Sequence, residues 1–113
     1  MSESVGTKRT RDLADTLRKD PTRFGRAVVT RVNALGPEFV LRAMQAVACF
    51  KGFTEDNDPW GEHDFGTFHL GGDKLFWKID AYEKGSAYSA GAESPENPAT
   101  TDRVLTVMLA EEY

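Results

Sequence analysis

The chain has 113 residues, of which 40% are hydrophobic and 11% aromatic, and its net charge is −4. This length is typical of one domain, and this composition argues against an intrinsically disordered chain. No apolar run approaches the ~20 residues of a membrane span, and no signal-peptide pattern is visible. We therefore expect a single cytoplasmic domain over residues 1–113, flexible over residues 1–7 and without a membrane association.

The only cysteine is Cys49, which cannot form an internal disulfide. It lies in an apolar stretch, and we predict a reduced, buried thiol. This prediction agrees with a cytoplasmic location.

The charges are distributed unevenly along the chain. Residues 1–42 contain nine Lys or Arg against five Asp or Glu, whereas residues 43–113 contain five against thirteen. The basic part could contact nucleic acid, and the acidic part could contact a basic protein groove. Two ordinary solvated faces would explain the same distribution.

The first half of the chain contains two predicted helices and one ambiguous segment. Residues 8–19 carry a thin apolar stripe at helical spacing, and Pro21 is predicted to follow the end of that helix. Residues 26–32 are ambiguous between helix and strand, and their β-branched valines favour a short strand. Residues 37–51 are predicted to be helical, because Pro37 suits a first turn and apolar residues recur every three or four positions.

A β-hairpin is predicted over residues 66–82. Gly72 and Asp73 suit the two central positions of a type II′ turn. The resulting pairs on the core face are Leu70–Leu75, Phe68–Trp77 and Gly66–Ile79. The opposite face is mixed and is a candidate partner-binding face, with Phe65, Thr67, His69, Phe76, Lys78 and Asp80.

The C-terminal third is predicted to be a long connection followed by a helix. Residues 82–97 are rich in Gly, Ser, Ala and Pro. Asn97 and Pro98 suit the N-cap and first position of a helix over residues 98–112. Its buried stripe would be Val104, Leu105, Met108 and Leu109. The expected fold is α+β, with a small antiparallel sheet, built on the hairpin, packed against the helices at 37–51 and 98–112.

Residues 56–66 carry four carboxylates, a histidine and a tryptophan, which are more functional side chains than a connecting loop requires. Asp58, Pro59 and Gly61 fit a type I β-turn, and the Asp58 side chain can also accept bonds from the backbone. The candidate site residues are those of this loop and two from the hairpin: Asp56, Asp58, Trp60, Glu62, His63, Asp64, Lys78 and Asp80.

A cation site is one hypothesis for this loop, because Ca²⁺ and Mg²⁺ prefer several oxygen ligands. A calcium loop beginning at Asp56 would match at Asp58 and Gly61. It fails at Trp60 and Thr67, where ligands belong. We therefore predict no metal and no cofactor.

Catalysis is a second hypothesis. His63 beside Asp64 could act as a general base, but neighbours on an extended chain point to opposite faces. Familiar phosphate-loop, zinc and nucleophile motifs are not found in the sequence, so we expect a binding protein rather than an enzyme. The alternative is a metal-dependent hydrolase or nuclease centred on the loop, with Lys78 and Asp80 completing the site.

Binding is the third hypothesis. Trp60 is a natural interface anchor, and the acids around it suit a basic partner, although Trp60 could equally fold over the core. A small DNA-associated regulator is also conceivable, with a basic N-terminal arm on phosphates: Lys8, Arg9, Arg11, Arg18, Lys19, Arg23 and Arg26. Aromatic residues do not interleave with these cations before Phe24, so base recognition is not expected.

Five blocks of sequence carry a resemblance to a family: residues 57–59, 61–66, 76–80, 103–106 and 108–113. Over about residues 24–113 the chain resembles a small uncharacterised bacterial family, a domain of unknown function met in plasmids, phages and integrated elements. The stretch Ala81–Glu83 departs from the family pattern. The resemblance implies an accessory role in a mobile genetic element. Non-catalytic inhibition of a host nucleic-acid-targeting defence complex, as by anti-CRISPR proteins, is its most concrete form.

Overall fold

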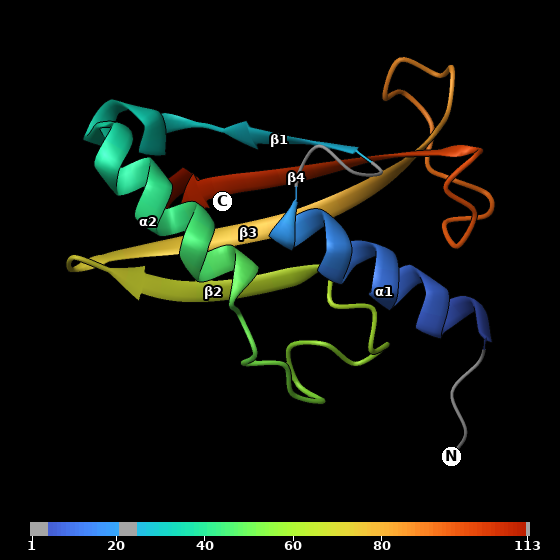
Figure 1. The fold of residues 1–113 in the computed structure, drawn as a ribbon, viewed down its shortest axis with the longest axis horizontal. Coiled ribbons are helices and arrows are strands. Elements are labelled where there is room, and N and C mark those ends of the chain that lie inside the picture. The colour runs from blue at the N-terminus through green and yellow to red at the C-terminus, as the bar shows by residue number, and fades with distance from the viewer. Residues whose placement is uncertain (1–4, 21–24, 113) are drawn as a thin grey trace.

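The computed structural model describes residues 5–20 and 25–112 (Figure 1). The elements of these residues, in chain order, are α1 (Val5–Lys19), β1 (Gly25–Val29), the 3₁₀ helix η1 (Arg31–Leu35), α2 (Pro37–Ala48), β2 (Phe65–Leu70), β3 (Asp73–Glu83), β4 (Thr101–Leu109) and the 3₁₀ helix η2 (Ala110–Glu112). The predicted α+β class is confirmed. None of the helices in the described ranges is long and apolar enough to span a membrane.

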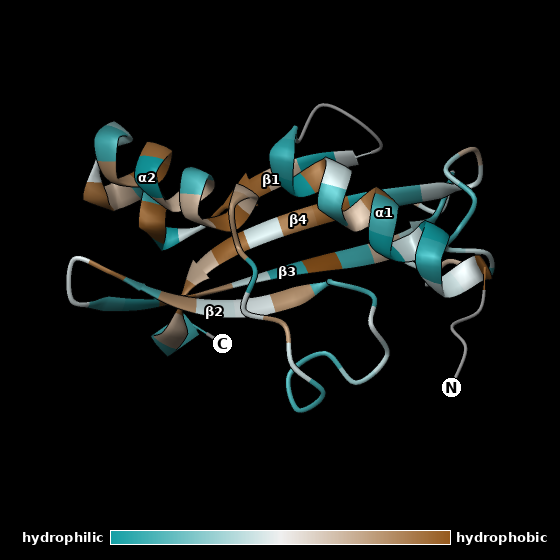
Figure 2. Ribbon diagram, turned by 60° about the horizontal axis from the view of Figure 1, so that its bottom comes forward, coloured by the Kyte–Doolittle hydropathy of each residue, from teal (hydrophilic) through white to brown (hydrophobic). Residues whose placement is uncertain are grey.

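The four strands form one mixed sheet in the order β1-β4-β3-β2. β1 runs parallel to β4, whereas the other two neighbouring pairs are antiparallel. Both α-helices lie on the same face of this sheet, as the two views agree (Figures 1 and 2). The fold is therefore two layers, and the core lies between them.

The core is built where the helices meet β3 and β4. Its fully buried centre is the indole of Trp77, which the rings of Phe50 and Phe53 contact edge to face at centroid distances of 5.4 and 6.0 Å. Figure 2 shows hydrophobic residues on β1, β4 and α2, whereas the segment between α2 and β2 is mostly hydrophilic. The main buried hydrophobic residues around Trp77 are Ala14, Leu17, Ala43, Val47, Leu75, Leu105 and Val107.

In the first half of the chain, the predicted types of element are confirmed, but their bounds differ. The N-terminal helix is longer than predicted and includes residues 5–7, which we had expected to be flexible, while residues 1–4 and Pro21 lie outside the described residues. The ambiguous segment is a strand followed by a 3₁₀ helix. α2 begins at Pro37 as predicted but ends at Ala48, three residues early.

The hairpin has the predicted faces but not the predicted register. Gly71 and Gly72, with φ of 60° and 88°, form the turn, and the strands pair Phe68 with Leu75 and Gly66 with Trp77. A turn with positive φ at both central residues is type I′, which two glycines adopt without steric cost. The predicted pairs were therefore wrong by two residues. Because a shift of two preserves the alternation, the six predicted core-face residues still share one face.

The predicted helix over residues 98–112 is wrong, because residues 101–109 form the strand β4. β4 lies inside the sheet, between β1 and β3, and is buried at most positions, although Asp102 and Thr106 on the face away from the helices are half-buried. Such a strand has a nearly continuous apolar run, which periodicity cannot distinguish from a helix. The β-branched Val104, Thr106 and Val107 were the neglected signal.

The prediction for Cys49 is also wrong, because its side chain is exposed. The buried positions of α2 are Ala43 and Val47, four residues apart. Cys49 lies two residues beyond Val47, and positions two apart on a helix do not share a face. Apolar neighbours in the sequence therefore led to the wrong prediction that this thiol is buried.

Candidate functional site

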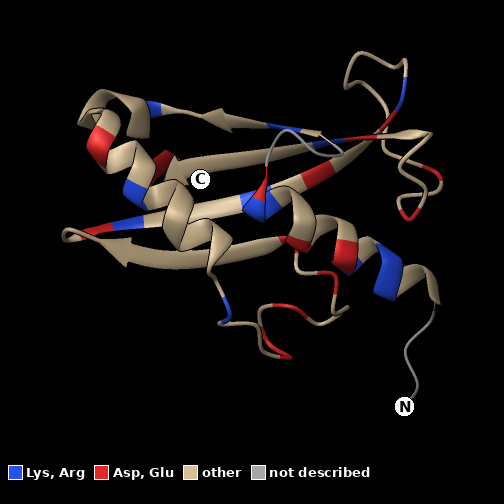
Figure 3. Cartoon of the chain, in the orientation of Figure 1, with Lys and Arg blue, Asp and Glu red and all other residues tan. Residues whose placement is uncertain are grey.

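The candidate site is the loop of residues 49–64 between α2 and β2, here called the α2–β2 loop. Figure 3 shows that acidic residues predominate along it. Its first part is organised by side chains, because the Thr54 N–H donates to Asn57 Oδ1 at 2.8 Å and the Asn57 N–H to Thr54 Oγ1 at 3.3 Å. Asn57 Nδ2 also donates to the Gly52 carbonyl at 2.8 Å. Local polar contacts thus shape this part of the loop.

Asp58 organises the second part of the loop. The predicted β-turn is confirmed, since the Gly61 N–H donates to the Asp58 carbonyl at 3.1 Å. Asp58 is only 9% exposed, and its carboxylate accepts from the N–H groups of Glu62 and His63 at 3.1 and 3.2 Å. These bonds satisfy two backbone donors that the turn leaves open. Asp58 is therefore a framework residue of the loop.

His63 anchors the end of the loop to α1. Its Nδ1 lies 2.8 Å from Asp15 Oδ1, and its Nε2 lies 3.7 Å from Asp58 Oδ2. The ring stacks on Phe53 at a centroid distance of 3.8 Å, and φ of His63 is 54°, in the left-handed region. Because both ring nitrogens face carboxylates, this geometry suits an anchor better than a general base.

A buried cation extends this contact into the core. Arg18 Nη2 lies 2.5 Å from Asp15 Oδ1, and Nη1 donates to the carbonyls of Val47 and Phe50 at 2.9 and 3.1 Å. Its guanidinium carbon lies 5.0 Å from the Trp77 ring centre. Arg18 therefore ties α1 to the C-terminal end of α2 and to the residues that follow it.

The burial of Arg18 corrects one sequence-based assignment. The side chain is 4% exposed, so Arg18 cannot belong to a phosphate-binding surface. Another member of that arm, Lys8, pairs with Asp12 at 2.7 Å, while Arg23 lies outside the described residues. The i, i+3 spacing of Asp15 and Arg18 was a visible signal for their pairing.

Glu62 and Asp64 of the loop lie together with Asp80 of β3 at a second pocket. With Arg103 and Thr10 they line a pocket of about 200 Å³. Burial raises the pKa of Glu62, and the Asp64 and Asp58 carboxylates add to this effect. Desolvation also raises the pKa of Asp64 and outweighs a bond to its own backbone, with Asp58 and Asp80 acting in the same direction as desolvation. Burial and neighbouring carboxylates both favour the neutral form of a carboxyl group.

Lys78 and Asp80 lie on the sheet face opposite the helices. Their side chains pair at 3.1 Å, which agrees with their predicted position on one face. Lys78 is opposite Phe65 on β2. Since Asp80 also lines the acidic pocket, it connects that pocket to the outer face of the hairpin.

Trp60 is at the exposed tip of the loop. Its side chain is 77% exposed, so the alternative in which it folds over the core is wrong. Asp56 is also exposed. The eight predicted residues thus divide into an exposed tip (Asp56 and Trp60), a framework (Asp58 and His63) and an acidic cluster with its counter-ion (Glu62, Asp64, Lys78 and Asp80).

Three residues of this region were not predicted from the sequence: Asp15, Phe53 and Arg103. Asp15 is 48 positions away from His63, and no local pattern links them. Arg103 was assigned to a helix that does not exist. Within residues 5–20 and 25–112, no three His, Cys, Asp or Glu side chains are grouped so that they could hold a metal ion.

Comparisons with known proteins bear on the family alone. No curated protein matches the chain, and no solved structure matches it. The family model described as "Protein of unknown function (DUF3768)" matches residues 28–112, which are most of the chain. The chain belongs to the DUF3768 family, a family of unknown function.

Proposed function

We propose that this protein is a non-catalytic binding module that presents the tip of the α2–β2 loop to a basic surface on a partner protein. The observation that carries the proposal is the 77% exposure of Trp60 on a turn whose backbone is held in place. Large aromatic side chains contribute most to binding when a partner buries them at the centre of an interface. An exposed indole on an ordered turn fits that role.

Order in the free loop supports this proposal. Asp58 holds the turn from inside, and His63 ties its end to Asp15 of α1. A loop that already has its bound shape loses less conformational entropy on association. Trp60 would therefore be available to a partner without rearrangement of the loop.

The charge of the loop supports a basic partner. Glu55 and Asp56 precede the turn and Asp64 follows it, and all three are exposed. Charges at the rim of an interface mainly raise the association rate and select partners of opposite charge. A groove lined with Lys and Arg is the complementary surface.

We infer as the specific setting a mobile genetic element whose protein inhibits a host nucleic-acid-targeting defence complex, in the manner of anti-CRISPR proteins. Such complexes carry basic grooves for nucleic acid. An acidic loop with an aromatic anchor could occupy such a groove in place of phosphates. The acidic balance of residues 43–113, with thirteen Asp or Glu against five Lys or Arg, supports this inference.

The test is affinity capture from the native host with matched variants as bait. Trp60→Ala removes the proposed anchor, and Leu41→Ala removes a large exposed side chain, 59% exposed, from α2. We expect a partner that wild type and Leu41→Ala retain and Trp60→Ala loses. Equal capture by both variants would exclude the loop tip from the interface.

A further inference from the structure

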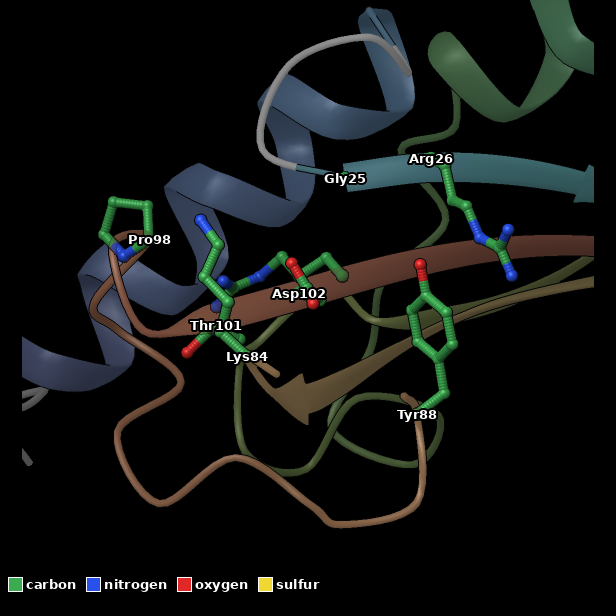
Figure 4. A pocket seen from close by; sticks show the side chains of 8 residues that line it. Gly25, Arg26, Lys84, Tyr88, Pro98, Thr101 and Asp102 are labelled. Atoms are coloured by element: carbon green, nitrogen blue, oxygen red, sulfur yellow. The ribbon is translucent and has the colours of Figure 1, made fainter. Parts of the chain in front are cut away.

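A second concave site lies at the end of the sheet where β1 and β4 begin, apart from Trp60. It is a pocket of about 290 Å³ lined by Arg26, Lys84, Tyr88, Asp102 and Arg103. In Figure 4, Arg26 from β1 and Tyr88 from the loop after β3 approach each other on one side of Asp102, and Lys84 and Pro98 lie on the other side. The volume is at the lower end of the ~300–1,000 Å³ of small-molecule pockets.

The pocket is positively charged although the chain is acidic. Arg26, Lys84 and Arg103 line it together with one carboxylate, Asp102, although Arg103 also lines the acidic pocket beside Glu62. Within the described part of the chain, neither Arg26 nor Lys84 forms an ion pair, and both side chains are exposed. A concave surface with excess positive charge concentrates anions.

Arg103 forms the buried wall of this pocket. Its side chain is 2% exposed, and its Nη2 donates to the Pro95 carbonyl, whereas Nη1 has no hydrogen-bond partner. Glu62 and Glu96 also act on its charge, partly opposing the effect of burial, which lowers the pKa of Arg103. Because Nη1 is buried out of reach of a ligand in the pocket, Arg103 contributes positive charge there rather than a direct hydrogen bond.

Tyr88 supplies an aromatic wall. The guanidinium carbon of Arg26 lies 4.5 Å from its ring centre, and Tyr82 contacts the ring edge to face at 5.5 Å. Ala87 and Tyr88 have φ of 55° and 64°, which side chains rarely adopt. Such backbone persists only when its surroundings hold it, and it is common at ligand sites.

We propose that this pocket binds a small phosphate monoester that carries a planar ring, such as a mononucleotide. The phosphate would lie beside Lys84, whose exposed ammonium can form a strong charge-assisted bond to a phosphate oxygen, while Arg26 and Arg103 add positive charge. The ring would lie against Tyr88. A small ligand is favoured over a nucleic-acid chain because the pocket is confined and the chain as a whole carries a charge of −4.

The test is a titration followed by amide chemical shifts in the full chain, with AMP as the probe and adenosine, inorganic phosphate and a short single-stranded oligonucleotide as comparisons. We expect AMP to shift the amides of Gly25, Lys84, Tyr88 and Asp102 and to bind more tightly than phosphate. Adenosine should leave these amides unshifted. Lys84→Gln should weaken AMP binding by about tenfold, through loss of one charge-assisted bond.

Lys74→Gln is the matched control, because Lys74 is an exposed lysine at the opposite end of β3. It should leave AMP binding unchanged. Four outcomes would overturn the proposal: no shifts with AMP, equal shifts with adenosine, equal affinity for phosphate and AMP, or equal losses in the two lysine variants. Tighter binding of the oligonucleotide than of AMP would instead assign the pocket to nucleic acid.

Discussion

The two tryptophans of this chain have opposite environments. Trp77 lies in the middle of β3 and is fully buried, whereas Trp60 lies at the tip of the α2–β2 loop and is 77% exposed. The burial of Trp77 explains its role, since a large indole contributes much of the free energy of a small core. Burial in this chain does not explain Trp60. We therefore assign Trp77 to stability and propose a role in recognition for Trp60.

Phe53 is the link between these two regions. Its ring stacks on His63 of the loop and contacts Trp77 of the core edge to face. The base of the loop thus packs on the core, whereas Trp60 at its tip is exposed. Variants ordered from the core towards the tip should show a falling effect on the free energy of unfolding.

The largest effect is expected for Trp77→Ala. The cavity left in the core should lower the free energy of unfolding by about 3–5 kcal/mol, measured by urea denaturation. Trp77→Phe is the control, since it keeps an aromatic ring and removes an indole N–H that has no hydrogen-bond partner. Its loss should be clearly smaller. A loss below about 1 kcal/mol for Trp77→Ala would contradict the assignment of Trp77 to the core.

An intermediate effect is expected for Asp58→Ala. The substitution leaves the N–H groups of Glu62 and His63 without their acceptor, which should cost about 1–3 kcal/mol. Asp56→Ala, at an exposed acid two residues away, should change stability by less than about 0.5 kcal/mol. Similar losses in both variants would mean that Asp58 is not the framework residue of the loop.

A smaller, pH-dependent effect is expected for Glu62→Gln. The pKa of Glu62 is raised in the folded state above the ordinary 4.5, so ionisation above that pH costs stability, and the cost is removed as the pH falls through the folded-state pKa. Glutamine cannot ionise. The stability of the variant relative to wild type should therefore rise between pH 4 and pH 7, by less than about 1 kcal/mol after solvent screening.

Thermal melts at several pH values would measure this difference. A difference that is constant across the range would mean that the acidic cluster does not disfavour the Glu62 carboxylate. A difference of the opposite sign would mean that the carboxylate stabilises the fold.

The fold was partly predictable because local chemistry decides much of it. Alternation placed Leu75, Trp77 and Ile79 on the core face, and the turn residues of Asp58–Gly61 were recognised from their types. The predicted hairpin register was wrong because Gly71 and Gly72 form a more favourable turn than Gly72 and Asp73. The prediction for residues 98–112 was wrong because a largely buried strand such as β4 lacks the alternation that identifies strands.

The site was less predictable than the fold. The sequence singled out the loop because of its unusual composition, but it could not divide the exposed tip from the framework. That division depends on Asp15 and Arg18, which reach the loop only through the tertiary fold. Likewise, Arg26, Lys84 and Arg103 come from three separate segments, and only the sheet brings them to one pocket.

The most direct test of the account is the affinity of the captured partner for wild type and Trp60→Ala, measured by titration calorimetry beside the free energy of unfolding. The account predicts binding weakened by about 2 kcal/mol or more, with stability changed by less than about 0.5 kcal/mol. Neutralising Asp56 should mainly slow association, and added salt should reduce that effect. Unchanged affinity for Trp60→Ala would contradict the assignment of the loop tip to recognition.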